Sequence, residues 1–328
     1  MNVGKISNED LKKYVFDNLH GRRSEVINGP NVGMDTSVID FDGDLIVLSM
    51  DPITGTTKDI GKLSINISCN DVSCERAEPV GVLMTILLPP KATLEELEQI
   101  VRQADIECEK LNLEIIGGHT EVTNAVNQIV VVTTVVGKLK KEDIPKRDEI
   151  KSGDIVIVSK YIGIEGTSII YNENKNELFK IFNNDEIIEI EEMGNVISVL
   201  EESKIAKKYN IKHLHDITEG GILGAVWETA NALDKKIVID LNLIPVKNTS
   251  KKIANYYNID IYRLISSGSM LMIIDEKDFE NYRLDCLNKN ILISEIGKVY
   301  NGDGSYLTED NKEIEIEAPL GDELYKIV

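Results

Sequence analysis

The stretch L-E-I-I-G-G-H-T-E-V-T, residues 113–123, joins the end of an apolar strand to a glycine pair and three polar side chains. Gly117 and Gly118 can adopt backbone conformations that other residues avoid, and they let another molecule approach the main chain closely. His119, a ligand-type side chain, follows directly. Such a strand end predicts either a binding site or an ordinary hairpin, because glycine-rich turns serve both.

Outward from this stretch, short apolar runs alternate with helical periods. Runs rich in Val, Ile and Thr predict strands over residues 44–50, 80–88 and 128–136. In the second half, strands are predicted over residues 154–159, 236–241, 269–274 and 292–299. Apolar residues recur at steps of three and four from Leu94 to Leu111, and Thr93 with Glu96 forms a capping box, so a helix is predicted there. Further helices are predicted over residues 195–209 and 222–232.

A charged segment separates two halves of comparable size. Residues 138–151 read K-L-K-K-E-D-I-P-K-R-D-E-I-K, a composition typical of a domain boundary. We therefore expect an N-terminal domain over residues 1–145 and a C-terminal domain over residues 146–328, each of the α+β class.

The composition is that of a globular protein with a strong negative charge. The chain has 328 residues, 42% of them hydrophobic, and a formal net charge of −20. This charge argues against nucleic acid and anionic membrane as partners, because both require basic surfaces. A phosphorylated ligand is still compatible with it, provided that a cation lies between the phosphates and the carboxylates of the protein.

The chain has no sequence features of secretion or membrane insertion. Its first residues, M-N-V-G-K-I-S-N-E-D, lack the apolar core of a signal peptide, and no apolar run is long enough to span a bilayer. Cys69, Cys74, Cys108 and Cys286 form no C-x-x-C pair, so neither a zinc ribbon nor a disulfide framework is predicted. We expect a cytoplasmic protein with reduced thiols.

Three aspartates occupy positions that suggest metal binding. Asp35 follows a glycine, Asp51 ends an apolar strand, and Asp71 lies within an otherwise apolar helix. Each alone is compatible with a turn or a helix cap. Together they suit Mg²⁺, which binds a few carboxylates and bridges the phosphates of a substrate. Neither the P-loop motif nor the Rossmann glycine motif is present.

A second polar cluster, H-L-H-D-I-T-E-G-G-I-L-G-A-V, occupies residues 213–226. Gly220 and Gly221 lead into a predicted helix whose first amides are expected to be available to an anion. His213 and His215 are compatible with this site, and equally with ordinary surface or hydrogen-bonded histidines.

Six motifs follow one another in a fixed order. They are V-G-M-D-T-S-V, L-S-M-D-P, D-I-G-K with C-N-D-V, I-I-G-G-H-T-E, H-D-I-T-E-G-G-I and S-S-G-S-M-L-M-I. This set resembles the AIR synthase (PurM-like) superfamily over nearly the whole chain. The D-I-G-K segment and the length are most similar to the HypE-like, AIR synthase-related proteins.

The resemblance implies a two-domain α+β fold, with an N-terminal domain that forms a β-barrel across a dimer and a C-terminal α/β sandwich domain. It also implies ATP and Mg²⁺ as cofactors, with ATP between the domains. Asp35, Asp51 and Asp71 match the metal-binding aspartates of the superfamily. The other residues that it assigns to the cofactor are Lys62, Asn70, Gly117, Gly118, Thr120, Asp216, Glu219 and Gly220.

The chain departs from the family pattern at several positions. His119 replaces a residue that is usually acidic, Glu121 stands where HypE-type enzymes carry lysine, and Met34 replaces a residue that is often acidic. HypE proteins end in a cysteine that becomes modified, whereas this sequence ends D-E-L-Y-K-I-V. Modification of a terminal cysteine is therefore not expected.

We expect an ATP- and Mg²⁺-dependent enzyme that passes a phosphoryl group to a carbonyl or amide oxygen of an unidentified acceptor. Asp71 is the expected catalytic metal ligand, and His119 and Glu121 are expected to orient the acceptor or act as a base. One alternative is a HypE-like accessory protein in hydrogenase maturation, which binds partner proteins with ATP as a ligand. Another is an inactive homodimer. A homodimer through the N-terminal strands is expected in each case, because so apolar a strand as residues 129–136 needs cover on both faces.

Overall fold

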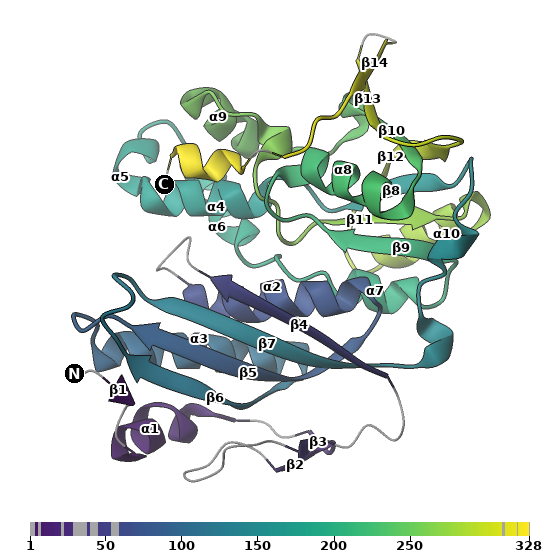
Figure 1. Ribbon diagram of the computed structural model, residues 1–328. Coiled ribbons are helices and arrows are strands. Elements are labelled where there is room, and N and C mark those ends of the chain that lie inside the picture. The colour runs from purple at the N-terminus through teal and green to yellow at the C-terminus, as the bar shows by residue number, and fades with distance from the viewer. Residues whose placement is uncertain are drawn as a thin grey trace. The chain divides into compact units, whose positions relative to one another are not determined.

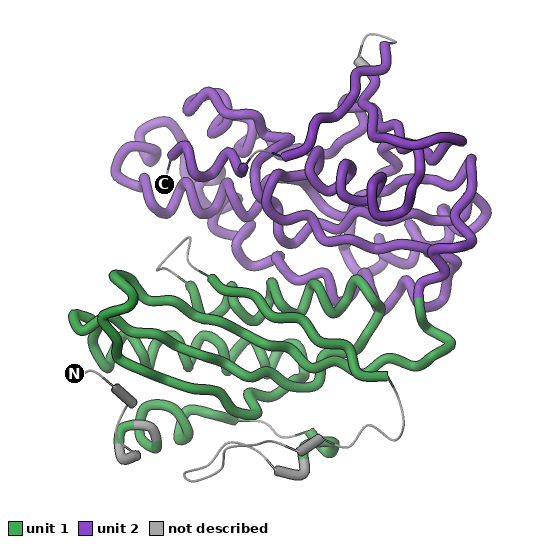
Figure 2. The backbone as a smooth tube through the Cα atoms, in the orientation of Figure 1, with its two compact units in different colours: residues 1–144 green, residues 145–328 purple. Residues whose placement is uncertain are grey.

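The computed structural model describes residues 4–5, 8–20, 23–28, 38–39, 45–53, 59–309, 312–319 and 321–327. The chain divides into two compact units, Met1–Ile144 and Pro145–Val328 (Figure 2). Each unit contains a mixed sheet with helices, as the α+β class predicts. Among the described helices, none combines the length and the apolar character that a membrane span requires.

Unit 1 is built on a five-stranded sheet with the strand order β1-β6-β5-β7-β4 (Figure 1). Its strands are β1 (Gly4–Lys5), β4 (Leu45–Ile53), β5 (Glu78–Leu88), β6 (Glu114–Val122) and β7 (Val130–Leu139). Strands β5 and β6 are parallel, and the other pairs are antiparallel. A separate hairpin-like pair is formed by β2 (Val26–Asn28) and β3 (Val38–Ile39).

Two long helices of unit 1, α2 (Ile60–Cys74) and α3 (Leu94–Leu111), pack against each other and against one face of the sheet. Thr93 and Glu96 form the predicted capping box at the start of α3. The short elements α1 (Asn8–Tyr14) and η1 (Phe16–Asn18) contact α3, and η2 (Lys141–Asp143) follows β7.

The sheet of unit 1 has a helix face, which packs on α2 and α3, and an open face on its other side. Residues of β7 alternate between buried and half-buried along the whole strand, as expected for a sheet covered on one side. Ile46, Leu48 and Met50 of β4 point to the open face and are 57%, 63% and 64% exposed. Strands β4, β5 and β7 confirm the strands predicted from the apolar runs.

Unit 2 contains a seven-stranded sheet with the order β14-β13-β10-β12-β8-β11-β9. Its strands are β8 (Ile155–Ser159), β9 (Ile211–Asp216), β10 (Lys236–Asp240), β11 (Met270–Ile274), β12 (Ile293–Tyr300), β13 (Ser305–Glu309) and β14 (Lys312–Glu315). Its α-helices are α4 (Ile164–Glu173), α5 (Lys175–Leu178), α6 (Asn184–Met193), α7 (Leu200–Ala206), α8 (Gly221–Leu233), α9 (Asn248–Tyr257) and α10 (Glu276–Leu287). Its 3-10 turns are η3 (Arg147–Glu149), η4 (Leu241–Leu243), η5 (Ile261–Arg263) and η6 (Glu323–Lys326).

Helices cover both faces of the unit 2 sheet. Apolar side chains of α4, α8 and α9 share one core with alternate residues of the central strands, such as Leu271 and Ile273. On the other face, the Tyr282 hydroxyl of α10 contacts Met272 and the main chain of α7. The sequence-based helix over residues 195–209 was too long, because α7 begins only at Leu200.

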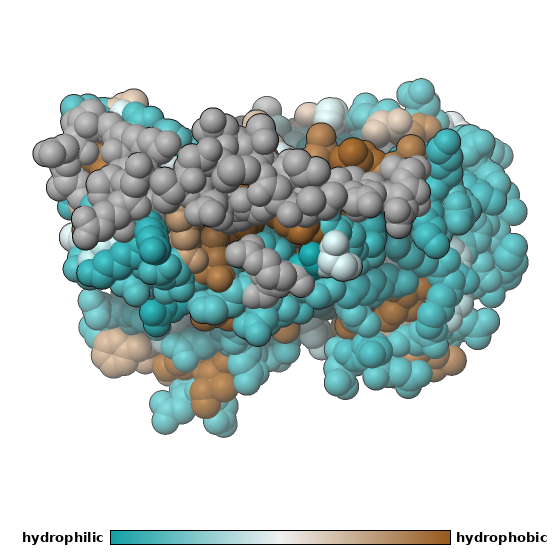
Figure 3. Space-filling view, turned by 90° about the horizontal axis from the view of Figure 1, so that it is seen from below, coloured by the Kyte–Doolittle hydropathy of each residue, from teal (hydrophilic) through white to brown (hydrophobic). Residues whose placement is uncertain are grey.

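Figure 3 shows hydrophilic surface with smaller hydrophobic areas on the side that is seen from below. This agrees with a charged content of 28% and a net charge of −20.

Candidate functional site

The first candidate cluster lies on the helix face of unit 1. Ser49 and Asp51 are alternate residues of β4 and point toward α2. The Ser49 hydroxyl lies 2.5 Å from Asp71 Oδ2 and 3.4 Å from Asp51 Oδ2. The structure therefore brings together Asp51 and Asp71, two of the three predicted metal ligands. The third, Asp35, lies outside the described residues.

The position of α2 brings Asp71 to β4. Gly61 permits the close approach of α2 to α3, because a Cβ there would lie 2.2 Å from the Ile100 carbonyl oxygen. The neighbours of Asp71 on the helix, Asn70 and Val72, are fully buried. Asp71 itself is only half-buried and has the Ser49 hydroxyl as a hydrogen-bond donor. The Asp71 carboxylate thus keeps contact with solvent and has a neutral hydrogen-bond donor. The buried face of α2 is also less apolar than the sequence suggested, because it includes Ser64, Asn66, Ser68, Asn70 and Ser73.

The chemistry of this cluster fits a hard cation. Two carboxylates and a hydroxyl are oxygen ligands, and Mg²⁺ commonly uses one or two carboxylates together with substrate phosphates. A group of three or more His, Cys, Asp or Glu side chains with metal-binding geometry is not found among the described residues. The cluster therefore suits an ion that shares its coordination with a ligand, and it does not form a closed protein cage.

His119 and Glu121 lie on the open face of the same sheet, away from Asp71. In the sheet, Asp51 pairs with Thr133, Thr133 pairs with Met84, and Met84 pairs with Gly118. Residues paired across neighbouring strands point to the same face, so Gly118 belongs to the helix face, as Asp51 does. His119 is the next residue along β6 and points the other way. Its Nε2 atom lies 3.4 Å from Glu121 Oε2. Within unit 1, the predicted catalytic set of Asp71, His119 and Glu121 is therefore not brought together.

The glycine pair has a structural explanation. Gly117 and Gly118 have φ angles of 153° and 148°, which favour glycine. A Cβ on Gly118 would lie 1.9 Å from the Met84 carbonyl oxygen. Gly118 therefore lets the neighbouring strand β5 approach closely. Thr120, the next residue on the helix face, is buried.

Lys62 points toward α3 and is separated from Asp71 by more than two helical turns of α2. Burial lowers the pKa of Lys62, and its charged neighbours are Glu107, Lys110 and Asp59. Asn70 is completely buried. Within unit 1, the predicted cofactor residue Lys62 thus lies in a different environment from the Asp51 and Asp71 pair.

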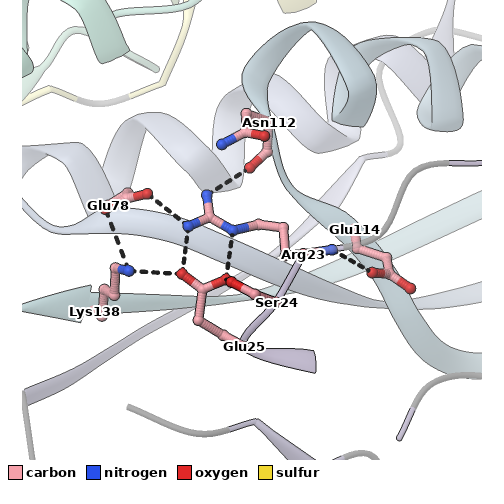
Figure 4. A network of polar contacts seen from close by, with 7 residues as sticks. All are labelled: Arg23, Ser24, Glu25, Glu78, Asn112, Glu114 and Lys138. Carbon is pink, nitrogen blue, oxygen red and sulfur yellow. Dashed lines mark hydrogen bonds and ion pairs between the residues drawn. The ribbon is translucent and has the colours of Figure 1, made fainter. Parts of the chain in front are cut away.

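A polar network on unit 1, which the sequence analysis missed, ties residues 23–25 to the sheet (Figure 4). Arg23 Nη2 lies 2.6 Å from Glu25 Oε1 and 2.9 Å from Glu78 Oε1. Lys138 Nζ lies 2.8 Å from the same Glu25 oxygen. These two cations hold the pKa of Glu25 well below its usual range. The sequence contains no local signal for the network, because its members come from distant segments.

The second cluster lies in unit 2 where β9 leads into α8. Asp216 ends β9 and is 5% exposed. Gly220 is the N-cap of α8, with a φ angle of 81°, and its amide donates a hydrogen bond of 2.7 Å to Asp322 Oδ2. Glu219 Oε1 accepts a hydrogen bond of 2.5 Å from the Tyr325 hydroxyl. The expectation that the first amides of this helix are available to an anion is therefore wrong for Gly220.

A buried acid, Glu165, lies beside this loop and was also missed. Glu165 is at the start of α4, and its Oε2 atom accepts a hydrogen bond of 3.0 Å from the Ser267 amide. Burial, with a smaller contribution from the carboxylates of Asp322 and Asp216, raises the pKa of Glu165 to about 7, although the hydrogen bonds from Ser267 lower it. The motifs G-I-E-G and S-S-G-S mark these two segments, but a local pattern does not show that they meet.

His213 and His215 are hydrogen-bonded residues of strand β9. Arg147 Nε donates to His213 Nδ1 over 3.3 Å, and His215 Nε2 lies 3.0 Å from Glu228 Oε2. Burial lowers the pKa of His213 to about 3, so the ring is neutral in the folded protein. Both rings point away from the face to which Asp216 belongs, because residues alternate along the strand.

Comparison with protein families decides the affiliation of the chain. The family model described as AIR synthase related protein, N-terminal domain, matches residues 33–139, and that of the C-terminal domain matches residues 151–310. The chain belongs to the AIR synthase related family. The two matches correspond to the two sheets and agree with the resemblance that the motifs indicated.

Relatives with similar sequences include a hydrogenase expression/formation protein and a carbamoyl dehydratase. A putative hydrogenase expression/formation protein of Methanocaldococcus jannaschii is 26% identical over 97% of this chain and 92% of its own length. Carbamoyl dehydratase HypE of Rhodobacter capsulatus is 23% identical over 69% of this chain and 65% of its own length.

Solved structures show that this AIR synthase related chain has the two-domain PurM-like fold. Escherichia coli HypE superimposes with a TM-score of 0.82 at 19% identity, covering 98% of this chain and 100% of that one. HypE in complex with ATP gives a TM-score of 0.72 at 18% identity, covering 93% and 97%. The HypE–HypF complex gives a TM-score of 0.72 at 21% identity, covering 86% and 92%.

Proposed function

We propose that this chain is an ATP- and Mg²⁺-dependent enzyme that phosphorylates a carbonyl or amide oxygen of an acceptor. The observation that carries the proposal is the Asp51–Ser49–Asp71 cluster, in which one hydroxyl lies within 3.4 Å of both carboxylates. A chain with a net charge of −20 needs a cation between its carboxylates and a triphosphate. The two aspartates would hold that cation, with Asp35 as the third proposed ligand.

The proposed reaction needs little covalent chemistry from the protein. The acceptor oxygen attacks the γ-phosphorus, the bond between this phosphorus and the bridging oxygen of ADP breaks, and ADP leaves. Phosphorylation converts a poor leaving group on the acceptor into a good one, which suits a family that contains a carbamoyl dehydratase. Catalysis would come from positioning and from charge neutralisation, and bound Mg²⁺ supplies much of the latter.

The functional assembly that we propose is a homodimer through the open face of unit 1. The row formed by Ile46, Leu48 and Met50 exposes apolar side chains on this face, and such rows mark interaction surfaces. His119 and Glu121 belong to the same face. A second copy packed there would enclose them, which is where we propose that they orient the acceptor or act as a base.

In unit 2, we propose that Asp216, Glu219 and Gly220 form the loop that faces the reacting groups.

The described cysteines, Cys69, Cys74, Cys108 and Cys286, are all buried and free of disulfides. This suits the reducing cytoplasm in which we propose that the enzyme works.

A direct test combines binding and turnover. Calorimetry should show Mg²⁺–ATP binding to the wild-type chain, and ADP release should accelerate in the presence of one member of a panel of carboxylate, amide and carbamoyl compounds. Asp71→Asn should abolish the accelerated turnover. Absence of Mg²⁺–ATP binding to a folded wild-type chain would refute the proposal.

The HypE–HypF complex among the structural neighbours supports a second candidate function. This is an accessory role in hydrogenase maturation, in which ATP is a ligand and the chain acts by binding a protein. ATP turnover that no metabolite accelerates, together with an ATP-dependent complex with a purified maturation protein, would favour this alternative.

A further inference from the structure

The segment 321–327 of unit 2 reaches back to the loop at the start of α8. Asp322 is 5% exposed, and its two carboxylate oxygens have different partners. Oδ1 accepts a hydrogen bond of 2.8 Å from the Leu324 amide and so caps η6. Oδ2 accepts a hydrogen bond of 2.7 Å from the amide of Gly220, which lies 102 residues earlier in the chain. One side chain thus fixes both its own turn and a distant loop.

Two further contacts join the same segments. The Tyr325 hydroxyl donates a hydrogen bond of 2.5 Å to Glu219 Oε1. This hydrogen bond, together with burial and the nearby carboxylates, raises the pKa of Tyr325 to about 12, so the hydroxyl is a proton donor at neutral pH. A Cβ on Gly220 would lie 2.9 Å from Pro319 Cβ, so the chain before the segment also packs on the loop.

The segment is held in place by contacts that do not involve the loop. Leu324 is 3% exposed and belongs to the apolar core of unit 2. Glu323 accepts a hydrogen bond from the Asp260 amide and pairs with Lys326 over 2.6 Å. The loop, in contrast, contains Gly220 and Gly221 with φ angles of 81° and 61°, and glycines leave a loop with many accessible conformations. The ends of the loop have main-chain hydrogen bonds of their own, from the Ile217 amide to Ser269 and from the Gly221 amide to Thr218. The segment adds the contacts that fix Gly220 and Glu219 between these ends.

We propose that Asp322 and Tyr325 are positioning residues for the Asp216–Gly221 loop. Asp322 fixes the main chain at Gly220, and Tyr325 fixes the direction of the Glu219 carboxylate. This inference rests on the proposed function, in which the loop faces the reacting groups. Such a loop must be held close to its productive geometry, and the two hydrogen bonds restrict the main chain at Gly220 and the side chain of Glu219.

The test uses full-length chains with three substitutions. Asp322→Asn weakens the bond to Gly220, and Tyr325→Phe removes the bond to Glu219 while leaving the ring. Glu317→Gln is the matched control, because it makes the same carboxylate-to-amide change at an exposed position of the same unit, five residues before Asp322.

The first measurement is hydrogen exchange of the chain without nucleotide. Peptides that contain residues 216–221 should exchange about fivefold to tenfold faster in Asp322→Asn and Tyr325→Phe, as expected when a hydrogen bond of this kind is lost. Peptides from the sheet should exchange at the wild-type rate, and Glu317→Gln should resemble the wild type throughout. Unchanged loop exchange in both variants, or equally fast exchange in Glu317→Gln, would overturn the positioning role.

The second measurement connects the loop to the reaction. ADP release from Mg²⁺–ATP should show a kcat that falls about tenfold in both variants, with KM within about twofold of the wild type, because the aspartates of unit 1 that are proposed to hold Mg²⁺–ATP are unchanged. Calorimetric stoichiometry of Mg²⁺–ATP binding normalises for the folded fraction. Faster loop exchange with unchanged kcat would overturn the connection. A wild-type chain that binds no Mg²⁺–ATP would refute the proposed function instead, while the exchange data would still decide whether the segment orders the loop.

Discussion

The hydroxyl of Ser49 donates a hydrogen bond of 2.5 Å to Asp71, and this bond joins β4 to α2 on the helix face of unit 1. It provides a neutral partner for a half-buried carboxylate, so the chain can fold with this acid in place before any cation binds. The same hydroxyl lies 3.4 Å from Asp51, which keeps the two carboxylates near each other.

Asp71→Asn should separate the ligand role of this acid from its structural role. An amide oxygen still accepts the Ser49 hydrogen bond, so the free energy of unfolding without ligand should stay equal or rise slightly. Affinity for Mg²⁺–ATP should fall by about tenfold or more, because a neutral amide is a poorer ligand for a hard cation. Calorimetry beside melting curves measures both, and Ser49→Ala, which should cost about 1 kcal/mol of stability, is the control. Unchanged affinity in Asp71→Asn would exclude a metal-ligand role.

ATP should stabilise the wild-type chain only together with Mg²⁺ or Mn²⁺. Without a cation, the triphosphate meets carboxylates and a net charge of −20, so binding should be too weak to detect by melting. At about one hundred times the dissociation constant, Mg²⁺–ATP should add about 2.7 kcal/mol to the free energy of unfolding. Thermal denaturation with and without EDTA measures the difference. Equal stabilisation by ATP in EDTA would contradict the cation bridge.

Leu48→Lys should convert the proposed homodimer into monomers. Leu48 is 63% exposed in the single chain and lies in the middle of the apolar row on the open face. A lysine buried there would place two uncompensated charges at the two-fold interface. Light scattering at micromolar concentration measures the molar mass of the protein in solution and so distinguishes monomer from dimer. Leu287→Lys, an equally drastic change at a 51% exposed position of unit 2, should leave the dimer intact. A monomeric wild-type chain would contradict the proposal.

Glu165→Gln should change how stability depends on pH. The pKa of Glu165 in the folded protein, about 7, lies above its ordinary value of 4.5. The folded state therefore retains a proton that the unfolded state has lost. The stabilisation is complete below the unfolded pKa and disappears as the pH rises through the folded pKa. Glutamine cannot lose this proton, so the variant should gain roughly 1 to 3 kcal/mol relative to the wild type between about pH 5 and about pH 8.

Denaturant unfolding across this pH range measures the effect. Glu317→Gln, a change at an exposed position, should leave the pH dependence as in the wild type. Parallel pH curves for the wild type and Glu165→Gln would show that the folded protein does not hold this proton.

Gly118→Ala should destabilise unit 1 through a backbone collision. A Cβ at this position would lie 1.9 Å from the Met84 carbonyl oxygen, and strand β5 cannot move without breaking its pairs. We expect a loss of about 2 to 4 kcal/mol. Gly153→Ala is the matched control, because its φ angle of 95° is also unfavourable but nothing lies within 4 Å of the added methyl group. It should cost about 1 to 2 kcal/mol in urea unfolding. Equal losses would show that strain, and not the collision, explains Gly118.

Local sequence patterns determined the principal elements and one pair of the candidate site. The apolar run over residues 128–136, rich in Val and Thr, predicted β7, and the Thr93 and Glu96 pair predicted the start of α3, because both signals depend on neighbours in the chain. The motifs predicted that Asp51 and Asp71 act together, and the structure places one hydroxyl between them. The helix predicted over residues 195–209 was too long at its start, where Val196, Ile197 and Val199 are β-branched and have low helix propensity.

Only the tertiary structure decided which residues of the site meet. Because side chains alternate along a strand, the sequence shows that Gly118 and His119 point to opposite faces of the sheet, but it does not show which of these faces α2 and α3 cover. That choice depends on the register across β4, β7, β5 and β6, which includes a shift between Val82 and Leu83. Likewise, the partner of the Gly220 amide is Asp322, 102 residues away. A hydrogen bond over such a separation forms only when the packing of the whole unit brings its two ends together, so no local pattern can contain it.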